Sequence, residues 1–119
     1  MENSKSLSLC RPYLGKRVWM VCDRPLGTRH PKHGYIYEVN YGYVPGVKAP
    51  DGGDLDAYYL GIDKPLEKTE GICVAIIHRR DDDDDKLVLV APGTIMSDAQ
   101  ILSAVDFQER WFDSIVIRS

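Results

Sequence analysis

Short hydrophobic runs, separated by turn-forming residues, occupy the first three quarters of the chain. Four runs rich in Val, Ile, Leu or Tyr are predicted to be β-strands: residues 17–22, 35–43, 72–77 and 87–90. A fifth run, residues 54–60, has a period of two that places Asp54, Asp56 and Tyr58 on one face and apolar residues on the other. Because residues 72–77 are apolar at every position, we expect that strand to be buried on both faces.

The last quarter of the chain changes to a helical period. Ser97 and Gln100 have the spacing of a capping box, and the apolar positions that follow predict a helix over residues 97–112. Residues 115–117 are predicted to form a final edge strand. Short strands followed by one helix indicate a mainly β fold, an OB-like closed β-barrel with one C-terminal α-helix packed against it (α+β).

Length and composition are those of a single globular domain. The chain has 119 residues and 44% hydrophobic residues, enough for one packed core, with residues 1–12 expected to be a loose lead-in. No apolar run reaches the roughly 18 residues of a membrane span, and no apolar secretory segment is visible near the start. The three cysteines, Cys10, Cys22 and Cys73, are far apart, which favours a reduced cytoplasmic protein with no disulfide framework.

The chain has a net charge of −3, and its acidic residues include five consecutive aspartates at residues 81–85. Without the aspartates of residues 81–85, the remainder of the chain is mildly basic. A nucleic-acid-binding protein that relies on phosphate contacts is expected to show a stronger basic excess. We therefore expect neither a nucleic-acid nor a membrane partner, and an oligonucleotide-binding barrel is disfavoured.

Three aspartates, Asp51, Asp54 and Asp56, lie within six positions of one another. Asp-Gly pairs are ordinary turn formers, which is one interpretation of residues 51–53. Asp54 and Asp56, however, fall on a predicted strand, where aspartate is depleted. Crowded carboxylates are typical of a site for hard divalent cations such as Mg²⁺, which take oxygen ligands and often carry phosphate.

The aspartate run at residues 81–85 has two interpretations. Taken alone, a charged run between two strands is most often a solvated hairpin loop. Lys86 follows it directly, however, and places a cation beside the carboxylates. Phosphate chemistry needs that mixture, because acidic groups hold metal ions and basic groups bind the oxyanion.

These segments resemble the soluble Mg²⁺-dependent (family I) inorganic pyrophosphatases. The resemblance rests on NYGYVPG at residues 40–46, DGGDLD at residues 51–56, and the Asp-X-Lys element followed by LVLVAP at residues 84–92, and it extends over residues 35–92. It implies hydrolysis of pyrophosphate to two phosphates by a metal-activated water, with two or more Mg²⁺ ions, or Mn²⁺ in their place. The expected substrate is pyrophosphate or a small phosphorylated molecule, and the resemblance is compatible with a homo-oligomer.

The resemblance also implies roles for individual residues. The implied metal ligands are Asp51, Asp54, Asp56, Asp84 and one further loop aspartate, Asp81 or Asp82. The implied substrate-binding residues are Tyr41, Lys86 and one arginine, Arg29 or Arg24. The expected catalytic residues are Asp56, Lys86 and Tyr41.

The chain departs from the family pattern at five positions. Gly53 stands where the family has its middle aspartate, and Trp19 and Val21 stand where it has a Lys and a Glu. Trp111 and Phe112 replace a Tyr-Lys pair of the helix. These departures motivate an alternative hypothesis, a non-catalytic barrel of the same shape that binds a phosphorylated metabolite, a nucleotide or a protein partner.

Overall fold

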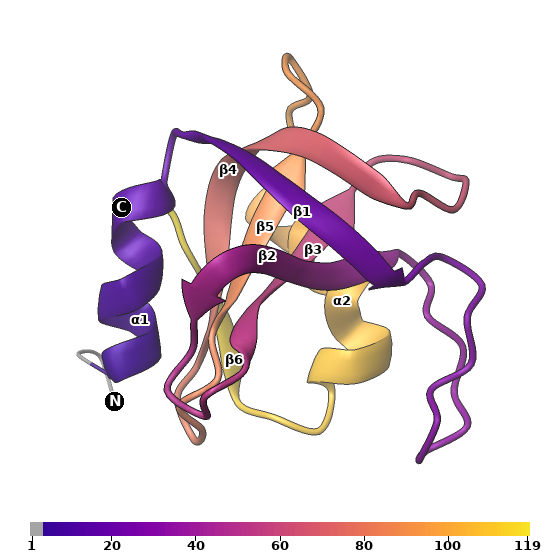
Figure 1. The fold of residues 1–119 in the computed structure, drawn as a ribbon, viewed down its shortest axis with the longest axis horizontal. Coiled ribbons are helices and arrows are strands. Elements are labelled where there is room, and N and C mark those ends of the chain that lie inside the picture. The colour runs from indigo at the N-terminus through magenta and orange to yellow at the C-terminus, as the bar shows by residue number, and fades with distance from the viewer. Residues whose placement is uncertain (1–3) are drawn as a thin grey trace.

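Five strands close into a barrel in the computed structural model, which describes residues 4–119 (Figure 1). The barrel strands are β1 (Arg17–Arg24), β2 (Asn40–Lys48), β3 (Asp54–Leu60), β4 (Lys68–Arg79) and β5 (Lys86–Val90). Neighbouring strands are antiparallel except for the parallel pair β3–β5, and pairing of β1 with β4 closes the barrel. A sixth strand, β6 (Ser114–Ile117), adds to β4 as the predicted edge strand. The mainly β, OB-like prediction is confirmed.

Two hydrophobic cores lie on opposite faces of β3, β4 and β5. Leu55, Ala57 and Leu87 point into the barrel interior with other apolar residues. Tyr58 and Val88, from the alternate positions, belong to a second core beneath the C-terminal helix. Burial on both faces explains why β5 is apolar after its first residue and why β4 is predicted as a doubly buried strand.

The helix α2 (Asp98–Glu109) covers the second core, on a different side of the barrel from the N-terminal helix (Figure 1). Its predicted capping box is present: the Ser97 hydroxyl accepts from the Gln100 N–H, and the Gln100 side chain accepts from the Ser97 N–H. Ile101 and Val105 are buried, as their helical spacing predicts. No helix among residues 4–119 is long and apolar enough to cross a membrane.

The strand predicted at residues 35–43 is wrong at both ends. Pairing of β2 with β3 begins only at Asn40 and extends to Lys48. The strand continues past the Pro-Gly pair because its register shifts between Val44 and Lys48. Before it, the Tyr35 and Tyr37 rings pack edge-on against Phe107 of α2, at 6.0 Å and 5.6 Å between ring centroids. Tertiary packing against α2 therefore overrides the β-propensity of this segment.

The expected loose lead-in at residues 1–12 is also wrong where the structure describes it; residues 1–3 lie outside the described part. A helix, α1 (Lys5–Cys10), is followed by a 3₁₀ turn, η1 (Arg11–Tyr13). Leu7 and Cys10 are fully buried in the interior core. The Ser6 N–H donates to Asp83 Oδ1 at 2.9 Å, and the Asp85 N–H donates to Ser6 Oγ at 3.1 Å. These contacts attach α1 to the loop between β4 and β5.

Replacing Ser6 with Ala is expected to lower the free energy of unfolding by about 1–3 kcal/mol, because the buried Asp85 N–H loses its acceptor. Urea denaturation measures this. Ser8→Ala on the exposed face of the same helix is the matched control and should change stability by less than about 0.5 kcal/mol. Equal effects of the two variants would mean that α1 does not dock as described.

Candidate phosphate-binding site

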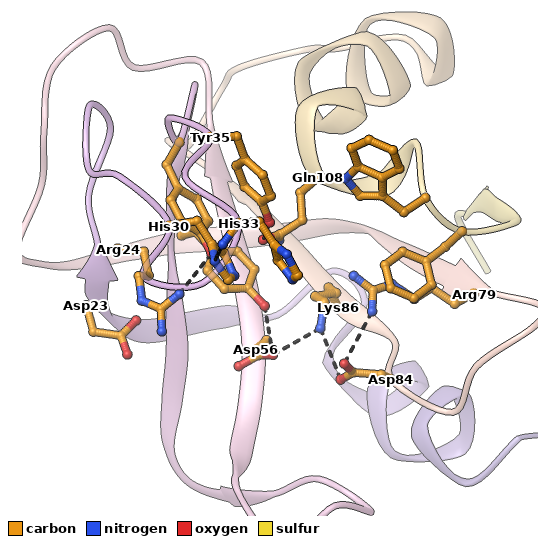
Figure 2. Close-up of a pocket in the computed structure, with 14 residues that line it drawn as sticks. Asp23, Arg24, His30, His33, Tyr35, Asp56, Arg79, Asp84, Lys86 and Gln108 are labelled. Atoms are coloured by element: carbon orange, nitrogen blue, oxygen red, sulfur yellow. Dashed lines mark hydrogen bonds and ion pairs between the residues drawn. The ribbon is translucent and has the colours of Figure 1, made fainter.

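A cavity of about 780 Å³ opens beside β1, β2 and β3, between the loop at residues 25–39 and the chain that follows α2 (Figure 2). Three carboxylates and three cations line it: Asp23, Asp56, Asp84, Arg24, Arg79 and Lys86. Two histidines and five other aromatic residues complete much of the wall. Charged groups of both signs gathered in an aromatic cavity are typical of a ligand-binding site.

Lys86 is the central charged residue of the cavity. Its ammonium lies 3.0 Å from Asp56 Oδ2 and 3.0 Å from Asp84 Oδ1, and only 2% of its side chain is exposed. A lysine ammonium has three N–H donors, so these two ion pairs leave one donor for a ligand. β3 supplies Asp56, and the first residue of β5 supplies Lys86; because these strands are parallel neighbours, the two side chains meet at one end of the barrel.

Tyr41 fixes the orientation of Asp56. Its hydroxyl donates to Asp56 Oδ2 at 2.7 Å, from the position on β2 that pairs with Tyr58 of β3. Burial, followed by the negative charge of Asp56, raises the pKa of Tyr41 well above its usual range. The hydroxyl therefore stays protonated as a donor, and Asp56 Oδ1 has no hydrogen-bond partner among residues 4–119.

Asp23 and Arg24 bring a second charged group to the cavity. The register of β1 against β2 shifts between Val21 and Arg24; Asp23 within this segment and Arg24 at its end both line the cavity. Arg24 Nη1 donates to the Tyr37 hydroxyl at 3.0 Å, and the guanidinium makes no ion pair under 4.0 Å with the described residues. Desolvation raises the pKa of Asp23; Arg24 opposes that shift, and the neighbouring Asp56 adds to it.

A buried ion pair joins Arg79, which lines the cavity, to Glu109. Arg79 Nε and Nη2 donate to the two oxygens of Glu109 at 2.9 Å and 2.8 Å, and the Tyr58 hydroxyl donates to the same carboxylate at 2.6 Å. The guanidinium also lies 3.7 Å from the centroid of the Phe112 ring. Two-point recognition of this kind fixes both partners, so the pair attaches α2 to the cavity end of β4.

Five of the residues predicted from the sequence line this one cavity: Tyr41, Asp56, Asp84, Lys86 and Arg24. Arg24 and Arg29 were alternatives, and Arg29 is exposed, with Nη1 donating to the Gly34 carbonyl at 2.7 Å. Asp51 is not among the lining residues; its Oδ1 accepts from the Gly53 N–H at 2.9 Å within the turn. Asp54 pairs with Lys48 at 3.0 Å, also away from the lining.

The aspartates at residues 81–85 have separate structural partners. Asp81 accepts from the Asp113 N–H, and Asp83 accepts from the Ser6 N–H. Asp82 lies 3.5 Å from Arg79, and Asp85 is buried against His78 at 2.8 Å. Of this run, only Asp84 lines the cavity. The hairpin prediction is confirmed, since β4 and β5 pair on either side of the run.

Asp23 and Arg79 line the cavity but were not predicted from the sequence. A visible signal for Asp23 was its place beside Arg24, at the end of a predicted strand. Arg79 gave no local signal, because its partner Glu109 is 30 positions away. Of the residues at the departures from the family pattern, Trp111 and Phe112 line the cavity, whereas Trp19 borders a separate hollow on the barrel surface.

Two carboxylates of the lining have oxygens that could hold a metal ion. Asp84 has both oxygens in ion pairs, with Lys86 at 3.0 Å and Arg79 at 3.3 Å. Asp56 Oδ1 and the Asp23 carboxylate have no side-chain partner among residues 4–119. Mg²⁺ is commonly bound by one or two carboxylates together with substrate phosphates. Within the described chain, no three His, Cys, Asp or Glu side chains gather as a preformed metal site.

The fold is that of the inorganic pyrophosphatases. No protein-family model and no curated protein sequence matches the chain. Among solved structures, an inorganic pyrophosphatase from Ehrlichia chaffeensis superposes with a TM-score of 0.68 at 14% identity, covering 88% of this chain and 87% of that one. The pyrophosphatase from Helicobacter pylori gives 0.62 at 16% identity, covering 90% and 84%. The one from Coxiella burnetii gives 0.60 at 19%, covering 87% and 86%. At identities below 20%, this structural likeness shows the fold alone.

Proposed function

We propose that the cavity binds a small phosphorylated ligand. The observation that carries the proposal is the position of Arg24 and Lys86, two cations with unused N–H donors, on the lining of one cavity. An arginine fork and a lysine ammonium are the side chains that most often bind phosphate oxygens. The likeness in fold to inorganic pyrophosphatases supports pyrophosphate as the first ligand to test.

The cations have different tasks in this proposal. Arg24 would bind the more exposed phosphate, because the residue is only half-buried and its guanidinium makes no ion pair with the described residues. Lys86 would bind the deeper phosphate through its third N–H. Arg79 keeps its two-point pair with Glu109 and holds the wall in place. The cavity is thereby pre-organised, which reduces the cost of ordering side chains on binding.

The charge of the lining favours a ligand that enters with a counter-ion. Its three carboxylates balance its three cations, so a bare polyanion would add uncompensated negative charge. Asp23 would hold the Mg²⁺ that accompanies a diphosphate, and Asp56 Oδ1 would accept from a water bound to that ion. We therefore propose that Mg²⁺ strengthens binding.

Hydrolysis of pyrophosphate is the second candidate, favoured by the contacts of Asp56. When bound, Mg²⁺ lowers the pKa of a coordinated water towards neutrality. Asp56 Oδ1 would accept a proton from the attacking water, while the Tyr41 hydroxyl holds Oδ2 in place at 2.7 Å. Lys86 would offset the charge that develops on the departing phosphate. Phosphate release from pyrophosphate tests this candidate separately from binding.

Calorimetric titration of pyrophosphate tests the binding proposal. We expect binding to the wild-type protein in Mg²⁺, and about a tenfold loss of affinity in Arg24→Gln, because charge-assisted hydrogen bonds are removed. Arg11→Gln, a change of the same chemistry at an exposed position whose guanidinium reaches Ser119, is the matched control and should bind as the wild type does. No heat of binding in Mg²⁺, or equal affinity of Arg24→Gln and the wild type, would contradict the proposal.

A further inference from the structure

The wall of the cavity contains more aromatic surface than an inorganic anion can contact. Seven of the lining residues have aromatic rings: His30, His33, Tyr35, Tyr37, Tyr41, Trp111 and Phe112. The volume of about 780 Å³ falls in the range, roughly 300–1,000 Å³, that holds drug-sized organic ligands. Pyrophosphate has no carbon or ring to cover such a wall.

The rings of the loop at residues 25–39 contact one another and form a continuous surface. His30 lies 4.7 Å from His33 and 4.8 Å from Tyr35 between ring centroids, and the planes of His33 and Tyr35 are within 10° of parallel. The His30 ring nitrogen Nδ1 accepts from the N–H groups of Lys32 and His33, both at 3.1 Å. Figure 2 shows His30, His33 and Tyr35 gathered above the Asp56–Lys86 pair. Held rings of this kind present a face to a ligand at little entropic cost.

Trp111, in contrast to these rings, is an exposed aromatic side chain. Its side chain lines the cavity, yet 68% of the residue is exposed. It makes no hydrogen bond, ring contact or cation–π contact with residues 4–119. A large aromatic residue left exposed beside a cavity leaves most of its apolar surface in water, and a planar ligand would cover that surface. Phe112 does not offer the same face, because Arg79 already lies over it at 3.7 Å.

We infer that the ligand is a phosphate ester or anhydride that carries a planar aromatic ring, as a nucleotide does. This inference rests on the proposed function, because the phosphates would occupy Arg24 and Lys86. The ring would lie against Trp111 or the His33–Tyr35 surface. Stacking on aromatic side chains tolerates different bases, so the structure assigns the class of ligand and not one base.

The test compares four probes by calorimetric titration in Mg²⁺: ADP, pyrophosphate, ribose 5-phosphate and adenosine. We expect ADP to bind at least about tenfold more tightly than pyrophosphate or ribose 5-phosphate, and adenosine to bind weakly because it has no phosphate. Trp111→Leu should weaken ADP binding about tenfold and change pyrophosphate binding less than about twofold. Trp19→Leu, at a 53% exposed tryptophan outside this cavity, is the matched control and should change neither.

The outcomes separate the inference from the function on which it rests. Equal affinity for ADP and pyrophosphate would overturn the inference that the ligand carries an aromatic ring. Equal losses of affinity for both ligands in Trp111→Leu would overturn it too. Either result would leave the phosphate-binding proposal intact. Absence of binding by every phosphorylated probe would overturn both. Because Trp111 is exposed, its replacement is not expected to disturb folding, and an unchanged circular dichroism spectrum checks this.

Discussion

Replacing Arg79 with Met is expected to lower the free energy of unfolding by about 3–5 kcal/mol. The guanidinium makes a two-point ion pair with Glu109 while only 5% and 4% of the two side chains is exposed. The variant leaves a buried carboxylate with hydroxyl donors from Tyr58 and Ser114 but without its cation. Urea denaturation at neutral pH gives the measurement.

The adjacent arginine is the matched control for this change. Arg80 pairs with Asp113 at 2.7 Å, with both side chains about half exposed. Ion pairs at the surface contribute little because water screens them, so Arg80→Met should have a much smaller effect. Similar losses in the two variants would contradict a special role for the buried pair.

Lowering the pH should narrow the difference in the free energy of unfolding between the wild type and Arg79→Met. Burial alone would raise the pKa of Glu109, but the hydrogen bonds and charge of Arg79 hold it below its usual value of 4.5. A lowered pKa contributes stability that is present above pH 4.5 and is lost as the pH falls through the pKa of the folded state. The variant has less of this stability to lose. A gap that widens with acid would contradict this assignment.

Replacing Asp56 with Asn is expected to reduce phosphate release from pyrophosphate by at least about a hundredfold, if the cavity is hydrolytic. Asparagine cannot accept a proton from water, and it removes the negative charge that pairs with Lys86 at 3.0 Å. A steady-state assay of released phosphate in Mg²⁺ is the measurement. Calorimetric titration of the same variant shows whether pyrophosphate still binds.

The control for this prediction is Asp106→Asn, an equivalent change on the exposed face of α2, where the carboxylate pairs with Arg110. Its phosphate release should match that of the wild type. Wild-type release no faster than that of Asp56→Asn, across Mg²⁺ and Mn²⁺, would refute hydrolysis. The binding proposal would then stand on its own titration.

The parts of the fold that have local causes could be predicted from the sequence. The capping box at Ser97 and the period of two in β3 are set by neighbouring residues, and both are present. The helix α1 could not be predicted, because its stability comes from Leu7 and Cys10 filling the barrel interior. The start of β2 was placed too early, because packing of Tyr35 against α2 depends on residues more than 70 positions away.

Some residues of the candidate site could likewise be predicted from the sequence, and others could not. Asp56 and Lys86 could be predicted, because short motifs carry them and parallel pairing of β3 with β5 brings them together. Asp23 has a local signal in its place beside Arg24, but no local pattern encodes the shift in strand register that brings it to the cavity. Asp51 has the sequence context of a metal ligand, but in the structure it closes its own turn.

Binding of a phosphorylated ligand in this cavity is tested most directly by NMR titration of ¹⁵N-labelled protein with pyrophosphate and Mg²⁺. We predict the largest amide shifts at Arg24, Asp56 and Lys86. Small shifts are expected at Asp51 and Asp81, which lie outside the cavity lining. Large shifts confined to Asp51 and Asp81, or no shifts at all, would contradict the account.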